Sequence, residues 1–128
     1  MNFSIREDDL SVQYSLASDP HFWVRVVKPV GQTLTISDAQ QGSQSPEAMG
    51  KALAKVLNKH ADNSINSITF ADVVPDLPVG ATEQRQAADC FDHLSAAVRR
   101  WALEAGRQVT NGYLDLRDGK FAAVFRLT

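Results

Sequence analysis

The sequence lacks most of the features that mark common protein classes. Its single cysteine, Cys90, cannot form a disulfide within the chain, and a lone cysteine is typical of a reducing compartment. The net charge is −2, which provides no strong field to attract nucleic acid or an anionic membrane. No stretch approaches the roughly eighteen consecutive apolar residues of a membrane-spanning helix. We therefore expect a cytoplasmic protein with no nucleic-acid or membrane partner.

The motifs of metal, nucleotide and catalytic sites are also missing. His21, His60 and His93 share no ligand spacing, and the sequence contains no H-E-x-x-H, Walker A or G-x-G-x-x-G motif. Asp89 and His93 lie one helical turn apart, and a carboxylate can orient an imidazole. Without a nucleophile, however, such a pair is more typical of a solvated helix face. The sequence predicts no metal, no cofactor and no catalytic residue, and it favours a non-enzymatic protein.

The clearest feature that is present is a long amphipathic helix. Apolar residues recur every three or four positions, as one face of a helix requires. Thr82 is the expected N-cap, and Gly106, which tolerates positive φ, is the expected end. Cys90 lies on or beside this apolar face, so we expect a buried, unreactive thiol. The stripe consists of Ala87, Phe91, Leu94, Val98, Trp101 and Ala105.

A β-hairpin is predicted after this helix. Asp118-Gly119 is typical of a type I′ turn, because both central residues of that turn need positive φ. Such a turn pairs Leu116 with Phe121 and sets the register of both strands. The same register places five apolar residues on one core-facing side, as a sheet that covers a core requires. These residues are Leu114, Leu116, Phe121, Ala123 and Phe125.

The rest of the chain reads as strands around a second helix. Alternating apolar and polar residues predict four strands, near residues 3–5, 12–16, 21–28 and 34–36. A polar loop over 37–45 follows, and Ser45, Pro46 and Glu47 have the N-cap, first-position and first-turn chemistry of a helix start. A buried strand is expected within 65–74.

The expected architecture is a single α+β domain over residues 1–128. Its elements follow the order β-β-β-β-α-β-α-β-β. The central strand-helix-strand unit predicts a parallel crossover within a mixed, mostly antiparallel sheet. Both helices are expected on one face of that sheet, which gives two layers.

The opposite sheet face is the first candidate site. Aromatic and arginine side chains are common anchors of protein interfaces, and Trp23, Arg25, Tyr113 and Arg117 all project to that face. The strand order, and therefore which of them are neighbours, remains open at this stage. The favoured function is a small soluble interaction module that binds a protein partner or a second copy as a homodimer. The whole face comprises Trp23, Arg25, Val27, Thr33, Thr35, Tyr113, Asp115, Arg117 and Arg126.

The loop before the first helix is the second candidate site. Gln41, Gly42, Ser43 and Ser45 lie between a strand and a helix N-terminus, where free backbone N–H groups can bind phosphate. The lysine row Lys51, Lys55 and Lys59 follows on this helix, and we interpret it as a solvated face.

The element order over residues 33–127 resembles the C-terminal half of the GNAT acetyltransferase fold. In that family a Q/R-x-x-G-x-G/A loop holds the pyrophosphate of acetyl-CoA, and Gln41 and Gly42 match part of it. The second glycine of the loop is missing, and Pro46 falls close behind. The resemblance implies an acyl-CoA- or nucleotide-binding protein with a small-molecule ligand, which is the alternative function.

Overall fold

The computed structural model describes residues 3–40, 45–71, 81–117 and 120–128. Its elements follow the predicted order and confirm the α+β class. Among the described residues, no helix is long and apolar enough to cross a membrane. The elements are β1 (Phe3–Glu7), β2 (Ser11–Leu16), β3 (Asp19–Val30), β4 (Thr33–Gln40), α1 (Pro46–His60), β5 (Ser67–Phe70), α2 (Ala81–Glu104), β6 (Val109–Arg117) and β7 (Lys120–Leu127).

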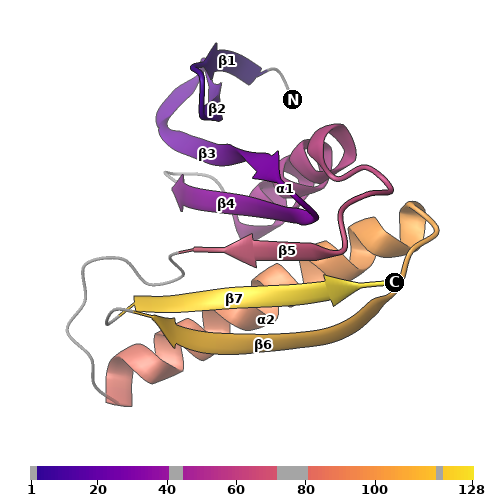
Figure 1. Cartoon of the computed structure of the whole chain (residues 1–128). Helices are drawn as coiled ribbons and strands as arrows, with labels where there is room; N and C mark the ends of the chain where they lie inside the picture. Colours follow the sequence, from indigo (N-terminus) through magenta and orange to yellow (C-terminus); the bar gives the residue numbers. More distant parts are fainter. Residues whose placement is uncertain (1–2, 41–44, 72–80, 118–119) are drawn as a thin grey trace.

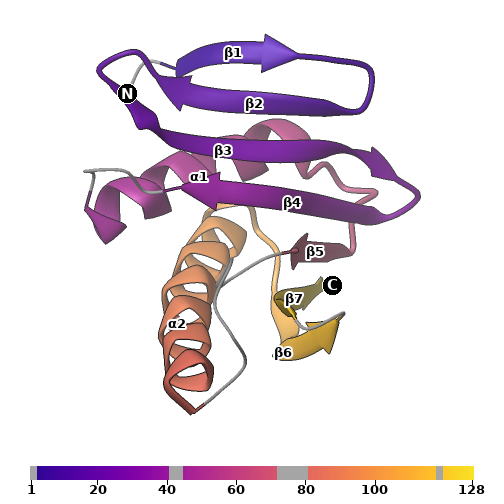
Figure 2. The same cartoon turned by 90° about the vertical axis from the view of Figure 1, so that its left-hand side faces the viewer.

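All the strands belong to one seven-stranded sheet with the order β1-β2-β3-β4-β5-β7-β6. The described neighbours are antiparallel except β4 and β5, which are parallel because α1 carries the chain back between them. Both helices lie behind the sheet in Figure 1, and the view in Figure 2 shows α1 behind β3 and β4 and α2 beside β5, β7 and β6. The predicted two-layer arrangement is therefore confirmed.

Local sequence signals account for the start of α1 and the end of α2. The Ser45 hydroxyl accepts a hydrogen bond from the backbone N–H of Ala48 at 3.1 Å, and Pro46 occupies the first helical position. Beyond α2, Gly106 adopts a φ of 70°, which a residue with a Cβ rarely adopts. Ser45 and Gly106 thus have the expected roles. The predicted N-cap of α2, Thr82, was wrong, because the helix already begins at Ala81.

The β6–β7 hairpin has the predicted register. Leu116 pairs with Phe121, and Gly112 pairs with Phe125. Phe125 packs so closely that a Cβ on Gly112 would meet its Cδ1 at 3.0 Å. Asp118 and Gly119, the predicted turn, lie outside the described residues. Leu116 was expected in the core, but it lies one pair from the end of the described hairpin and is 53% exposed.

The strands on either side of α1 differ most from the prediction. Ser37 to Gln40 were expected in a loop, but they extend β4 because β3 continues beside them. Ser37 is the extra residue of a bulge, since Arg25 pairs with Asp38 while Val26 pairs with Ile36. By contrast, β5 begins at Ser67 and ends at Phe70, whereas the predicted strand covered 65–74, of which residues 72–74 lie outside the described residues. β4 therefore runs past its last β5 partner, where Ile36 pairs with Phe70.

The core lies between the sheet and the two helices. Trp101 on α2 is 1% exposed, and its Nε1–H donates to Oδ1 of Asn58 on α1 at 2.9 Å. Phe91, also on α2, stacks on Phe125 with ring centroids 5.3 Å apart. The predicted stripe of α2 is correct at these positions, whereas its last member, Ala105, lies beyond the helix and is exposed.

Candidate binding groove between the two helices

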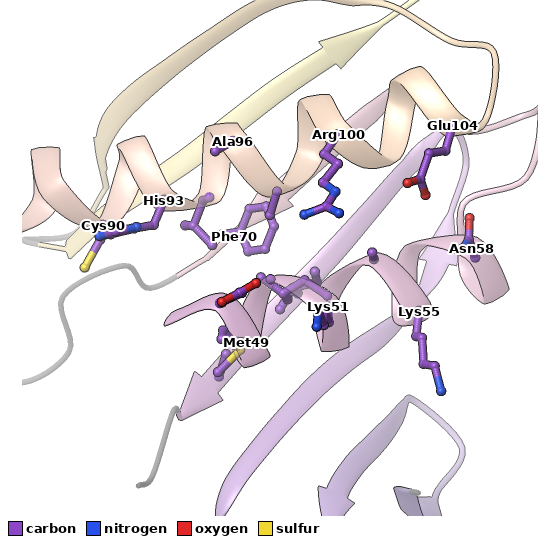
Figure 3. A pocket seen from close by; sticks show the side chains of 18 of the residues that line it. Met49, Lys51, Lys55, Asn58, Phe70, Cys90, His93, Ala96, Arg100 and Glu104 are labelled. Carbon is purple, nitrogen blue, oxygen red and sulfur yellow. The ribbon is translucent and has the colours of Figure 1, made fainter. Parts of the chain in front are cut away.

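A groove with a volume of about 870 Å³ lies between α1 and α2. Its apolar side chains come from both layers: Ile36 and Phe70 from the sheet, Leu53 from α1, and Leu94 and Ala97 from α2. In Figure 3, the ring of Phe70 lies between the two helices. Ligand sites are typically lined in this way, mainly by apolar groups with a few polar groups that fix the orientation of the ligand.

The topology of the sheet explains why the groove forms here. Ile36 and Phe70 form the last pair of the parallel β4–β5 ladder, and β5 ends there. The two strands therefore have their carboxyl ends on the same side of the sheet, and in Figure 1 the arrowheads of β4 and β5 both point to the left. In open sheets that contain parallel strands, ligands bind outside these carboxyl ends.

The polar rim of the groove follows from helical periodicity. On α2, Cys90, His93, Arg100 and Glu104 are separated by steps that keep them on one flank of the helix. The facing flank of α1 carries Glu47, Lys51, Lys55 and Asn58. Figure 3 shows Glu104 and Asn58 at one end of the groove, with Cys90, His93 and Met49 at the other. The two helices thus present opposed polar rows above a common apolar floor.

Arg100 is a cation that projects into this space. Figure 3 shows its guanidinium reaching from α2 towards α1, beside Phe70. Among the described residues, it has neither a salt bridge nor a hydrogen bond to another side chain. The other arginines nearby have partners: Arg99 donates its Nε–H to the Ser95 hydroxyl at 3.1 Å, and Arg107 donates to the carbonyl oxygens of Asp62 and Thr128.

Cys90 forms part of the groove wall and is half-buried, so the expectation of a fully buried thiol is wrong. Burial raises the thiol pKa, and the negative charge of Asp89 raises it further. The thiol therefore stays protonated at neutral pH, which makes it a weak nucleophile. His93 lies on the same rim, whereas Asp89 is exposed outside the groove. The groove does not bring the Asp89–His93 pair together as a unit.

The candidate residues on the open sheet face lie in two separate places. The Arg25 guanidinium lies 5.2 Å from the ring centroid of Trp23, and each side chain is also hydrogen-bonded to a glutamine. Tyr113 is on β6, four strand positions from β3, which corresponds to about 19 Å at the usual spacing of about 4.8 Å. Its cross-sheet row ends at Val27, not at Trp23. Arg117 belongs to β6, but its side chain is outside the described structure.

The loop candidate can be followed only at its end. Gln41, Gly42 and Ser43 lie outside the described residues. Ser45 is described, and its hydroxyl is used as the cap of α1. The first turn of α1 nevertheless contributes Glu47 to the rim, so the start of this helix adjoins the groove.

A smaller hollow of about 260 Å³ lies between α1 and the first two strands. There the Tyr14 hydroxyl is hydrogen-bonded to Nε2 of His60. Burial lowers the pKa of His60 and raises that of Tyr14. Lys55 and Lys59 lie over the rings of Phe3 and Tyr14 at 5.9 and 5.8 Å, so two members of the predicted solvated lysine row contact aromatic rings.

The residues that shape the groove were largely missed by sequence reasoning. None of Arg100, Lys51 and Phe70 was a predicted site residue. A signal existed on α2, where the polar residues that flank the apolar stripe repeat with helical spacing. No local pattern, however, indicates that the opposed flank of α1 would face them across a gap.

No protein-family model, curated protein or solved structure matches the chain.

Proposed function

We propose that the chain is a non-enzymatic binding domain that holds a small organic ligand in the groove between α1 and α2. The observation that supports this proposal is the groove itself, with its apolar floor and polar rim at the carboxyl ends of β4 and β5. Its volume of about 870 Å³ lies within the usual range for ligand sites, roughly 300–1,000 Å³. The protonated state of Cys90 favours binding over covalent catalysis at this site.

Acyl-CoA and nucleotides are the first ligand classes to test. Both combine a flat or apolar part, which suits a floor formed by Phe70 and Leu53, with phosphates, which suit cations and a helix N-terminus. The element order that resembles the GNAT acetyltransferases adds a fold-level analogy in the same direction. The lone cysteine is compatible with action in the cytoplasm.

Thermal unfolding with CoA, acetyl-CoA and ATP at millimolar concentration tests the proposal. A ligand that binds only the folded state stabilises it, by about 2.7 kcal/mol at a hundred times its Kd. Ala97→Phe should fill the groove and abolish the shift in Tm, whereas Ala88→Phe, on an exposed part of α2 outside the groove, should preserve it. If a ligand stabilises both variants equally, its site is elsewhere and the groove is not the binding site.

The open sheet face supports a second candidate function, an interaction module that binds a partner protein or a second copy. Both helices cover the other face, and Trp23 with Arg25 forms a half-buried aromatic and cationic cluster on the uncovered one. Light scattering of the native chain and of Trp23→Ala tests self-association. Tyr113→Ala reports separately on the distant part of the face. A native monomer whose pull-down partners persist in both variants would rule out this surface.

A further inference from the structure

We infer that the groove selects an amphipathic ligand with one compact anionic group, and that Arg100 holds this group while the apolar part lies along the groove floor. This inference rests on the proposed binding of a small organic ligand in the groove, and it favours a ligand with one anionic group over acyl-CoA and nucleotides. An alkyl carboxylate and an alkyl phosphate share the required chemistry.

The position of Arg100 provides the first argument. Its guanidinium projects from α2 into the groove and has no partner among the described side chains. A guanidinium presents a planar fork of N–H donors that matches carboxylate and phosphate oxygens in pairs. Lys51 lies on the facing helix and adds a second cation without a described ion pair. The groove therefore offers the guanidinium of Arg100, unpaired among the described residues, to an anionic group and has a second cation, Lys51, on its other wall.

The floor beside Arg100 provides the second argument. Ile36, Leu53 and Phe70 are 2%, 2% and 4% exposed, so they close the bottom of the groove with apolar side chains. The apolar surface that a ligand can reach comes from the half-buried lining residues Met49, Ala54, Leu94 and Ala97. Leu94 and Ala97 extend the apolar surface along α2 towards Cys90. An anionic group held at Arg100 would consequently continue into an apolar tail that runs towards the open end of the groove.

The acidic residues of the rim limit the charge of the ligand. Glu104 lies at the Asn58 end, Glu47 lies in the first turn of α1, and Asp38 lies on β4. The cations Arg100 and Lys51 face these three acids, while Lys55 turns away from α2 towards Phe3, so the rim as a whole attracts no extended polyanion. A single anionic group in the middle is favoured over a chain of phosphates that would pass the acids.

Binding of decanoate and decyl phosphate to the full chain, followed by calorimetry and by amide chemical shifts, tests this inference. Decanol is the matched uncharged ligand, and ATP is an anion without an alkyl arm. We expect both alkyl anions to bind at least about tenfold more tightly than decanol. A charge-assisted hydrogen bond contributes enough free energy to change the Kd by about this factor. The largest shifts should fall at Leu94, Ala97 and Ala54, which line the groove.

Arg100→Gln should remove the preference for the anions over decanol, and Arg100→Lys should retain part of it. Arg99→Gln is the matched control, because Arg99 is an exposed neighbour that does not line the groove. Arg100 is exposed, so its variants should have the same Tm as the native chain.

The outcomes separate this inference from the proposed function. If decanol and decanoate bind equally to the native chain, or if Arg100→Gln keeps the preference, the role of Arg100 is wrong while the groove remains a ligand site. If ATP or CoA binds the groove more tightly than the alkyl anions, the ligand class is wrong and the proposed function stands. If neither the alkyl probes nor CoA and ATP bind, both proposals fail.

Discussion

The N-terminal part of the sheet and the C-terminal part hold their helices in different ways. Over β1 to β4, α1 combines buried apolar residues such as Leu53 and Leu57 with polar and aromatic contacts. These contacts include the Tyr14–His60 hydrogen bond and the lysines over Phe3 and Tyr14. Over β5 to β7, α2 is fastened by apolar packing, with Phe91 stacked on Phe125. Each helix therefore packs on its own part of the sheet, and the sides of the two helices that face each other line the groove.

The two parts meet closely at one end. Trp101 and Asn58 connect the helices there, and Figure 2 shows α2 running away from α1 towards its N-terminus. In the sheet, the parts are joined by the short parallel pairing of β4 and β5. The groove therefore lies between two well-packed units. We call the two connections between them, the Trp101–Asn58 contact and the β4–β5 pairing, the seam. Variants can test each unit and the seam separately.

The largest effect is expected at the seam. Trp101→Ala removes a fully buried side chain and leaves a cavity, so we expect it to lower the free energy of unfolding by about 3–5 kcal/mol. Urea unfolding measures this change. Asn58→Ala, which keeps the ring but leaves its N–H without the described partner, should cost about 1–3 kcal/mol. Equal losses in the two variants would show that the hydrogen bond, not the packing, holds the seam.

Two glycines, one in each part, should respond with opposite signs. Gly112→Ala places a Cβ 3.0 Å from Phe125, so we expect a loss of about 1–3 kcal/mol from overpacking. Gly50→Ala lies inside α1 with no atom within 4 Å of the added Cβ, so we expect a gain of up to about 1 kcal/mol from helix propensity. Thermal and urea unfolding of both variants give the comparison, and a stable Gly112→Ala variant would contradict the tight packing of the hairpin under α2.

The polar contacts between α1 and the sheet should contribute less to the free energy of unfolding. Tyr14→Phe keeps the ring but removes the hydroxyl from His60, and we expect a loss of about 1 kcal/mol. Unfolding in urea at pH 8 measures it. The matched control Tyr113→Phe alters a half-buried tyrosine with no described hydrogen bond and should be close to neutral. A neutral Tyr14→Phe variant would show that apolar packing and the aromatic contacts hold α1 without help from this hydrogen bond.

The smallest effect should be a pH dependence of the free energy of unfolding that arises from His60 in the N-terminal part. Burial, and then the charge of Lys59, lower the pKa of folded His60 from the ordinary value of 6.5, while Glu7 partly opposes this. The unfolded chain therefore takes up a proton first as the pH falls below about 6.5, and stability decreases from there down through the folded pKa. His60→Gln should flatten this part of the curve of unfolding free energy against pH. An unchanged slope would assign the dependence to other groups.

Local chemistry made the elements predictable, whereas long-range geometry decided the sites. Ser45 and Gly106 act through their own backbone neighbours, and the hairpin register follows from a two-residue turn, so those features could be predicted. The alternation of residues correctly placed Trp23 and Tyr113 on one sheet face, but only the strand order shows that they are far apart. Ser37 to Gln40 became a strand because β3 extends beside them, which no feature of their own sequence indicates.

The groove could not be predicted for the same reason. Arg100 and Lys51 lie on two helices that were correctly predicted, yet their position relative to each other depends on the angle between those helices. That angle is set by contacts between distant residues, such as Trp101 with Asn58.

The short strand β5 has a consequence for the order of folding. The strands before it pair with their neighbours in sequence, and β6 pairs with β7 through a hairpin, so these contacts close short loops. β5 instead joins β4 across α1 and β7 across α2, and such loops close more slowly. In pulsed hydrogen exchange during refolding, we expect the amides of Ile68 and Phe70 to gain protection after those of β2, β3 and the hairpin, so the floor of the groove would be completed last.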